Sequence, residues 1–449
     1  MLGETYADDL PIRMSPSIQK LGWVYVWCHL ALFAIGLYDA VSKYWQIGDF
    51  LGEVGVGFIL YPVLVPALTL CVVERLEMGS AQSSSQGVTC RDEHLTPTWS
   101  SMNEQRTFVR PAWFSFLLAV ALCLPVVVLG QAKKEGSPEK NLPPNVTQLT
   151  GFGERASWSP DGKRIAFMSK SNGDAFEIDL KTKLTRLLTG HFLHKGFLRV
   201  QYLPNGDFFL IGARTFEDIR TTRERDQEMW VLKAAAKEPP VPLNHKIDSG
   251  VAISLKRMKI AWSNTHGQYS DQLARGESVL YTADIVYKGS VPTLENKTEI
   301  IRTKAPDCTL EAQDFRNNDT ELIYTCYRST YADVMGVDLS TKKVTVYRKL
   351  PDEYNEVEGI YPNGKYALVE SSREQGGPER QNLRYIDIWR LKLEPNSNDF
   401  VRMTRWGDYD GYKASNPVVS PDGKWMAFQS ARSKDPPGVG YGIFLLKIE

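Results

Sequence analysis

The sequence lacks the features that would place it in several common functional classes. It has no surplus of either charge, because 53 lysine and arginine residues balance 53 aspartate and glutamate residues. A protein that binds nucleic acid needs a basic surface for the phosphates, so we expect no nucleic-acid partner. The six cysteines include no Cys-x-x-Cys pair, which argues against a zinc ribbon and against a thioredoxin-like redox site.

Signs of catalysis and metal binding are also missing. The chain has no Gly-x-Ser-x-Gly motif, the turn that presents the nucleophile of α/β-hydrolases. His191 and His194 lie three residues apart without a carboxylate cluster beside them, and Asp408 and Asp410 lack the ligand pattern of an EF-hand loop. We interpret these four residues as loop and turn positions, and expect no catalytic residue, no metal and no cofactor.

Long apolar runs are present, and they all lie before residue 131. Three runs, at about 21–41, 54–73 and 112–130, are long enough to cross a bilayer, which takes about 20 residues. None of them shows the polar face of an amphipathic helix. The sequence therefore predicts a membrane region of three transmembrane helices over residues 1–130, followed by a linker at 131–144.

Basic residues beside these runs predict the orientation. The loop between the first two runs carries only Lys43, whereas the preceding tail and the loop between the second and third runs carry Arg13, Lys20, Arg75, Arg91, Arg106 and Arg110. Loops rich in lysine and arginine stay in the cytoplasm. We expect a protein of the cytoplasmic membrane, in contact with its lipid, whose C-terminal part lies on the periplasmic or extracytoplasmic side.

The third run has an alternative interpretation as a signal peptide. Met102 precedes Arg106 and Arg110, then the apolar segment, then the small residues Gly130 and Ala132 around Gln131. A basic start, an apolar stretch and a small-x-small site are typical of a cleaved signal. In that case the mature protein is a soluble exported domain. Both interpretations export the C-terminal part.

An internal repeat organises residues 145–449. Residues 159–162 and 420–423 both read Ser-Pro-Asp-Gly, each followed by a strand-like segment. Proline, aspartate and glycine provide the backbone angles of a tight turn, so both segments predict β-hairpins. Weaker copies occur at 204–207, 316–319 and 362–365, and a further turn is inferred near 256–257.

Six turns at an average spacing of about 52 residues suit four-stranded units of a β-propeller. Third and fourth strands follow several of the turns, as at 176–180 and 184–189. The last unit stops at its third strand, 443–448, and residues 145–150 have the pattern of a fourth strand. The sequence therefore predicts an all-β, six-bladed propeller in which an N-terminal strand completes the last blade.

Residues 158–169 and 419–430, both built on Ser-Pro-Asp-Gly-Lys followed by an apolar strand, resemble the repeat of TolB-type propellers, which are periplasmic proteins. The likeness extends over about 145–449. It implies a six-bladed propeller outside the cytoplasm. The apolar runs depart from TolB, and the small α/β domain of TolB has no counterpart here.

Two sets of residues are candidates for function or stability. A basic residue follows the second strand of most units, which predicts a cationic rim on one face of the ring, suited to anionic ligands or to an acidic partner: Lys170, Arg214, His266, Arg328, Arg373 and Arg432. The alternative is that each pairs with a nearby acid such as Glu217 or Glu374. Cys308 and Cys326 flank the turn at Asn317 symmetrically, and either a disulfide or a reduced core pair fits.

We expect a non-enzymatic, membrane-anchored propeller that binds a protein partner or another ligand. Its membrane helices either anchor it alone or dock it as an accessory subunit of a larger membrane complex. The alternative is an exported enzyme of the lyase or lactonase type. Such an enzyme requires convergent histidine, acidic or arginine side chains in the central pocket.

Overall fold

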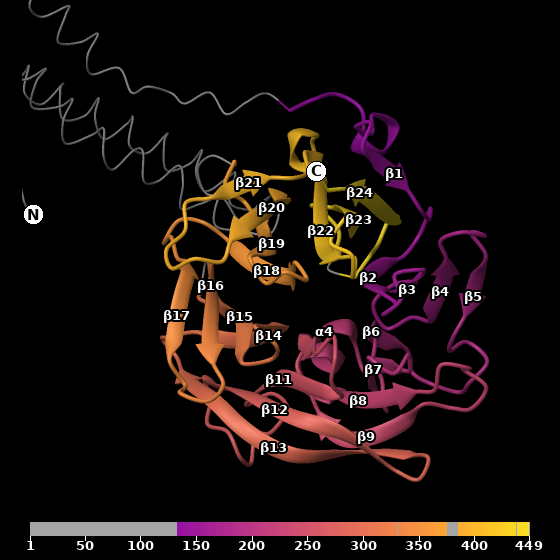
Figure 1. Ribbon diagram of the computed structural model, residues 1–449, viewed down its shortest axis with the longest axis vertical. Coiled ribbons are helices and arrows are strands. Elements are labelled where there is room, and N and C mark those ends of the chain that lie inside the picture. Colours follow the sequence, from indigo (N-terminus) through magenta and orange to yellow (C-terminus); the bar gives the residue numbers. More distant parts are fainter. Residues whose placement is uncertain (1–132, 330, 375–384, 437, 449) are drawn as a thin grey trace, which may run out of the picture. The chain divides into compact units, whose positions relative to one another are not determined.

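The computed structural model describes residues 133–329, 331–374, 385–436 and 438–448. In this part of the chain, 24 strands form six four-stranded antiparallel sheets arranged as blades around a central axis (Figure 1). The predicted six-bladed all-β fold is therefore confirmed. No helix within the described ranges is long and apolar enough to span a membrane, and the three apolar runs lie outside them.

Each blade starts near the axis and ends at the rim (Figure 1). The first three blades are β2 (Glu154–Trp158), β3 (Arg164–Met168), β4 (Ala175–Asp179) and β5 (Thr185–Leu187); β6 (Phe197–Tyr202), β7 (Phe208–Ala213), β8 (Gln227–Leu232) and β9 (Val241–Lys246); and β10 (Val251–Ile253), β11 (Lys259–Thr265), β12 (Glu277–Lys288) and β13 (Val291–Lys304).

The other three blades have the same order, except that the sixth takes its outer strand from the start of the domain. They are β14 (Thr309–Arg316), β15 (Glu321–Tyr327), β16 (Ala332–Asp338) and β17 (Val344–Arg348); β18 (Asn355–Ile360), β19 (Tyr366–Ser371), β20 (Asp387–Lys392) and β21 (Phe400–Arg402); and β22 (Tyr412–Val419), β23 (Trp425–Arg432), β24 (Ile443–Lys447) and β1 (Val146–Gln148).

All six predicted turns join the first and second strands of a blade. The two best copies of the repeat form the same local hydrogen bonds. Asp161 accepts from the Ser159 hydroxyl at 2.6 Å and from the Lys163 amide at 3.1 Å, and Asp422 repeats this with Ser420 and Lys424. The repeat is recognisable from sequence because these bonds are local.

The predicted closure by an N-terminal strand is also confirmed. β1 pairs antiparallel with β24, and Thr147 lies opposite Leu445. This pairing gives the sixth blade its fourth strand and joins the two ends of the propeller. It also covers the edge of β24, which would otherwise be open.

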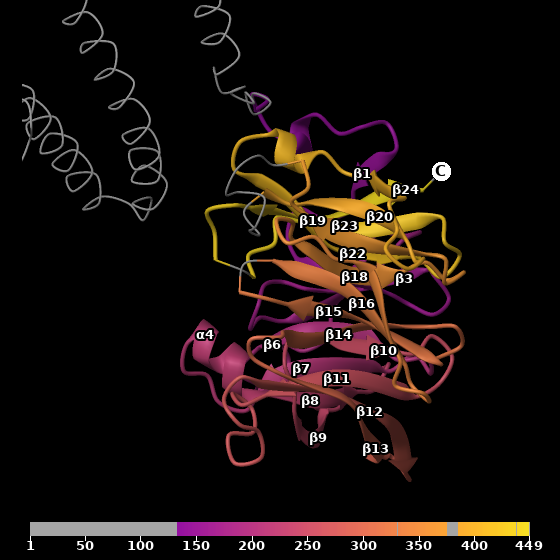
Figure 2. The ribbon, with the colours of Figure 1, turned by 90° about the vertical axis from the view of Figure 1, so that its left-hand side faces the viewer.

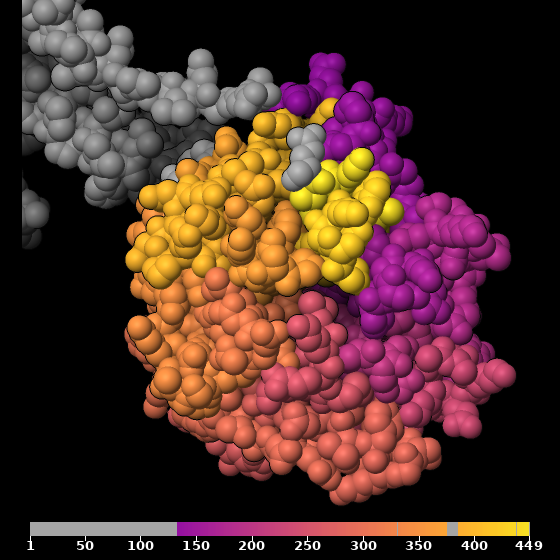
Figure 3. Space-filling model, in the orientation of Figure 1, coloured from indigo at the N-terminus to yellow at the C-terminus, as the bar shows by residue number. Residues whose placement is uncertain are grey.

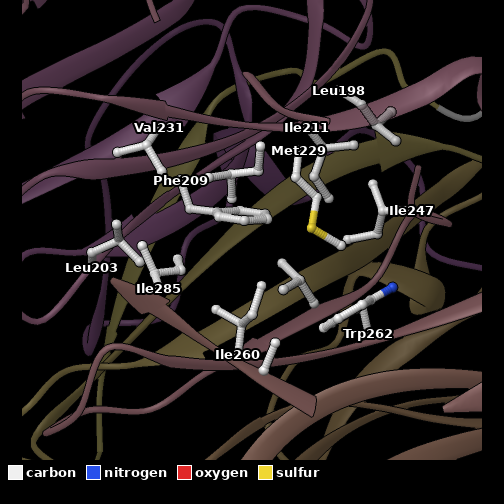
Figure 4. Packing of buried hydrophobic residues seen from close by; sticks show 13 residues of the cluster. Leu198, Leu203, Phe209, Ile211, Met229, Val231, Ile247, Ile260, Trp262 and Ile285 are labelled. Atoms are coloured by element: carbon white, nitrogen blue, oxygen red, sulfur yellow. The ribbon is translucent and has the colours of Figure 1, made fainter. Parts of the chain in front are cut away.

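Hydrophobic clusters lie between all neighbouring blades of the ring. Figure 4 shows the one between the second and third blades, where Phe209, Met229 and Trp262 pack together. A blade is thus buried on both faces. This explains why a middle strand such as β7, Phe208–Ala213, is buried at every position and does not alternate like a strand with one face in water.

Short helical segments lie in the connections. Within the described residues they are the 3₁₀ helices η1 (Pro138–Lys140) and η5 (Trp406–Asp408), the single turn α4 (Ile219–Thr221) and the π-helical η2 (Thr222–Asp226). The segment α4–η2 projects from one face of the ring, on the left in Figure 2. We call this the cavity face, because inner strands begin there, and the opposite side, with the six hairpin turns, the turn face.

Residues 133–144, which the sequence suggests are a linker, lie against the sixth blade in the structure. The Lys134 amide donates to the Asp408 carbonyl at 2.7 Å, and Glu139 pairs with Arg432 at 2.8 Å. Ser137 and Pro138 are buried. The chain therefore enters the propeller along the cavity face.

Candidate functional site

A cavity of about 300 Å³ lies at the centre of the ring, where the inner strands begin. Figure 3 shows the opposite side of the ring, the turn face, which is also hollowed near its centre. Charged side chains dominate the walls. The carboxyl groups are those of Asp248, Glu311, Glu356, Glu358 and Glu370, and the cations are Arg155, Arg199, Arg223, Lys413 and Arg432.

Three glutamates of the fifth blade form the centre of this site. Glu356 and Glu358 lie two residues apart on β18, and Glu356 is paired in register with Glu370 on β19. One carboxylate oxygen from each lies within 4.8 Å of the other two. Glu358 and Glu370 are 8% and 3% exposed. Oxygen ligands at this spacing could hold a hard cation such as Ca²⁺, which makes this the candidate cation position.

Two tyrosines hold Glu356. The hydroxyls of Tyr327 and Tyr354 donate to its two carboxylate oxygens. The Tyr327 hydroxyl also lies 2.6 Å from Glu311. Because a phenol carries a single proton, both contacts of Tyr327 can be hydrogen bonds only if one of the two glutamates is protonated. The arrangement therefore favours a shared proton.

Burial and mutual repulsion raise the pKa values of these carboxyl groups. Desolvation, with Glu370 and Glu311 nearby, raises the pKa of Glu356 to about 8. Burial also raises the pKa of Glu358 well above its usual value. Burial and the charge of Glu311 raise the pKa of Asp248 to about 6. The pKa values rise because too little positive charge lies nearby to stabilise the ionised carboxylates.

The side chains that line the cavity carry too little positive charge to balance its carboxyl groups. Arg155 is paired with Glu154, and Arg432 with Glu139, and neither partner is among the cavity's wall residues. Three cations, Arg199, Arg223 and Lys413, then face five carboxyl groups. Arg199 lies 4.0 Å from Glu358. Fully ionised, these side chains carry an excess of two negative charges, which protons or a cationic ligand can neutralise.

A second cavity of about 350 Å³ opens among the hairpin turns. Its walls include Trp158, Ile253 and several prolines of the turns. Glu358 lines both cavities. This glutamate therefore lies between the charged pocket and the more apolar mouth on the turn face.

Most residues of the cationic rim predicted from the sequence contact groups within or beside their own blade. Arg214 pairs with Glu228 at 2.9 Å and not with Glu217, and Arg328 pairs with Asp333 at 2.8 Å. His266 Nδ1 lies 2.7 Å from the Leu273 carbonyl. Lys170 and Arg373 are exposed. Of the six, Arg432 lines the cavity, so the rim as predicted does not describe the wall of the pocket.

The other residues singled out from the sequence have local structural contacts. His191 Nε2 lies 2.7 Å from the Ala236 carbonyl, whereas His194 Nε2 lies 3.0 Å from Asp174. The two imidazoles thus contact different groups. Asp408 ends η5 and pairs with Arg402 at 2.6 Å.

Cys308 and Cys326 are joined by a disulfide, with their Cα atoms 5.4 Å apart. They do not stand directly opposite each other, as a regular hairpin centred on Asn317 would require. Cys326 is opposite Leu310, because the turn is centred beyond Asn317 and a bulge follows Ala312. The bond therefore joins the two strands diagonally.

No described protein family and no curated protein matches this sequence. Among solved structures, TolB from Acinetobacter baumannii is 9% identical with a TM-score of 0.41, and the match covers 68% of this chain and 65% of that one. A putative TolB from Agrobacterium tumefaciens is 12% identical over 68% and 97% of the two chains, with a TM-score of 0.33.

A gluconolactonase from Xanthomonas campestris is 6% identical with a TM-score of 0.45, over 68% of this chain and 89% of that one. At such identities these likenesses concern the fold alone. Six blades and Ser-Pro-Asp-Gly turns make the C-terminal part of this chain a TolB-like propeller. Activity has to be argued from the cavity itself.

Proposed function

We propose that the protein is a membrane-anchored, extracytoplasmic binding module whose ligand presents a positively charged group to the central cavity. The observation that carries the proposal is that five carboxyl groups line the pocket, whereas two of its five cations, Arg155 and Arg432, are paired with glutamates outside the wall. A cation placed there gains from charges that are shielded from water. Its arrival also displaces the proton that the raised pKa of Glu356, about 8, retains near neutral pH.

The flanking arginines favour a ligand that carries charges of both signs. Arg199 and Arg223 line the same pocket as the three glutamates. An arginine guanidinium binds carboxylate or phosphate groups. A chain terminus or a loop of a protein partner, or a small amino compound, meets this requirement.

Thermal unfolding in the presence of chosen probes tests the charge preference. Putrescine and Ca²⁺ serve as cationic probes and succinate as the anionic one. We expect a cationic probe to raise the melting temperature, because a ligand that binds only the folded state stabilises it. The Glu356→Gln/Glu358→Gln double variant should lose this response. Glu295→Gln, at a half-exposed ion pair on β13, is the control. Stabilisation by succinate alone would contradict the proposal.

Fractionation of membranes tests the anchor. We expect the full-length chain to remain in carbonate-washed membranes and to be solubilised only by detergent. Mass spectrometry of the mature N-terminus and of co-purifying proteins then separates the alternatives. A soluble product that begins near Lys133 would refute the anchor and favour a cleaved signal. Stoichiometric membrane partners would support an accessory subunit.

One observation favours a second candidate function, an exported enzyme of the lyase or lactonase type. Burial and the neighbouring carboxylates raise the pKa of Glu356 to about 8, two phenols hold it, and arginines line the same cavity. A carboxyl group that titrates near neutral pH is suited to general acid–base catalysis. Assays with lactones and oligouronides test this. The Glu356→Gln variant should abolish any turnover while the fold is retained.

A further inference from the structure

The point at which the chain enters the propeller is fastened to the cavity face. Besides the backbone bond of Lys134 to Asp408, the Lys134 ammonium lies 3.1 Å from the Asp408 carboxylate. The Lys133 ammonium donates to the Gly407 carbonyl at 2.7 Å. Six residues after Lys133, Glu139 accepts from the Ser430 hydroxyl at 2.6 Å. These contacts hold residues 133–139 beside Arg432, at the edge of the cavity.

The loop that receives Lys133 and Lys134 is itself held in place. Asp387, 2% exposed, accepts from the amides of Trp406 and Gly407 at 2.8 and 3.0 Å. It also pairs with Arg402 at 2.6 Å. Trp406 is 2% exposed and packs edge-on against Phe428 and Phe444 of the sixth blade. Lys133 is therefore attached to the body of the propeller, and not to a loose loop.

We infer that the cavity face is the side of the propeller that faces the lipid bilayer. The inference rests on the proposed membrane anchor. The third apolar run ends at residue 130, and the three peptide units up to Lys133 span at most about 10 Å. A propeller tied so closely at this face cannot present its turn face to the same membrane, because the ring lies between the turn face and Lys133.

Apolar side chains on the cavity face suit such contact. Six exposed ones occupy loops on this face: Phe152, Leu193, Phe216, Ile219, Leu350 and Val439. Leu193 is fully exposed. Leu184, Leu255, Val291 and Val344 are exposed at the turn face. The attachment at Lys133 therefore decides the orientation, and the apolar residues are compatible with it. The occupant of this face is the interfacial region of the bilayer, where aromatic and aliphatic loop residues insert.

This orientation restricts how a ligand reaches the charged cavity. The pocket opens on the side of the propeller nearest the membrane. Its ligand is therefore a group presented at the membrane surface, such as the exposed loop or terminus of a membrane protein.

Depth-dependent quenching tests the orientation. The full chain, with Cys28, Cys71, Cys90 and Cys123 replaced by serine, is reconstituted into vesicles that contain lipids spin-labelled at the head group. A fluorophore is attached either at Leu193→Cys on the cavity face or at Leu255→Cys on the turn face. Both positions are exposed, so labelling should leave the fold intact. We expect at least threefold stronger quenching at position 193.

Flotation of the same vesicles separates the two proposals. If the protein does not float with the lipid, the anchor itself is refuted. If it floats but quenching at position 255 equals or exceeds that at position 193, the orientation is refuted and the anchor stands. A circular-dichroism spectrum of each labelled variant establishes that the propeller is folded.

Discussion

Replacing Thr147 with proline tests whether β1 closes the ring. The Lys447 amide donates to the Asn145 carbonyl at 2.9 Å, and the Leu149 amide donates to the Ile443 carbonyl at 2.7 Å. Hydrogen-bonded and non-hydrogen-bonded pairs alternate along an antiparallel ladder. Thr147, opposite Leu445, therefore directs its amide toward β24, and the amide of Gln148 points away from it.

The expected loss follows from this geometry. Thr147→Pro removes one ladder bond, leaves the Leu445 carbonyl without its donor and turns the proline ring toward β24. We estimate a loss of about 3 kcal/mol. Gln148→Pro is the matched control, because both side chains are exposed. The control removes no ladder bond and loses only the weak contact of Gln148 with the Thr150 carbonyl at 3.2 Å, worth less than about 1 kcal/mol.

Thermal unfolding of the detergent-solubilised protein, followed by circular dichroism, measures both variants. In a domain of this size each kcal/mol shifts the melting temperature by about 2 °C. Thr147→Pro should lower it by about 6 °C and Gln148→Pro by less than about 2 °C. Equal shifts in the two variants, or no shift in Thr147→Pro, would refute the closure by β1 as the source of stability.

Three further predictions concern the site, the disulfide and the turns. Stability against urea should fall as pH rises from about 5 to about 8. The pKa values of Asp248 and Glu356, about 6 and about 8, lie above those of the unfolded chain, so the folded state holds protons that the unfolded state has released. Glu356→Gln should flatten the dependence of stability on pH, and a rise in stability with pH would contradict the prediction. Cys308→Ser should cost about 3 kcal/mol for a loop of 18 residues, which is checked by melting with and without dithiothreitol; a reductant effect that persists in the variant would argue against this bond as the source. Gly423→Ala, at a φ of +73°, should cost about 1 kcal/mol in the same melting experiment, whereas Gly151→Ala, with open space around it, should be neutral.

The fold could be predicted because its signals are local. The bonds within Ser159–Lys163 and Ser420–Lys424 depend on neighbouring residues alone. Each turn fixes the strands on both sides of it. The weak turn near Lys256 was found from its flanking strands, and β10 and β11 do flank it. The disulfide register could not be predicted as well, since the bulge after Ala312 has no clear sequence signal.

The candidate site could not be predicted in the same way, because its parts come from different blades. Glu356 meets Glu311 from β14, Tyr327 from β15 and Glu370 from β19. The balanced composition of the whole chain conceals the local excess of carboxyl groups. The predicted rim consists of residues at the ends of the second strands, where Arg214 and Arg328 pair with acidic residues of the third strands.

The burial of the inner strands offers a better way to predict which residues line the central cavity. The first strand of a blade is covered by both neighbouring blades, so a charged residue near its start is costly unless it reaches the axis or a partner. Five inner strands have such a residue at their second or third position: Arg155, Arg199, Glu311, Glu356 and Lys413. All five line the central cavity. Charged residues near the start of the inner strands therefore identify the wall of the central cavity in this propeller. Their positions can be predicted from the sequence once the hairpin turns of the repeat are located.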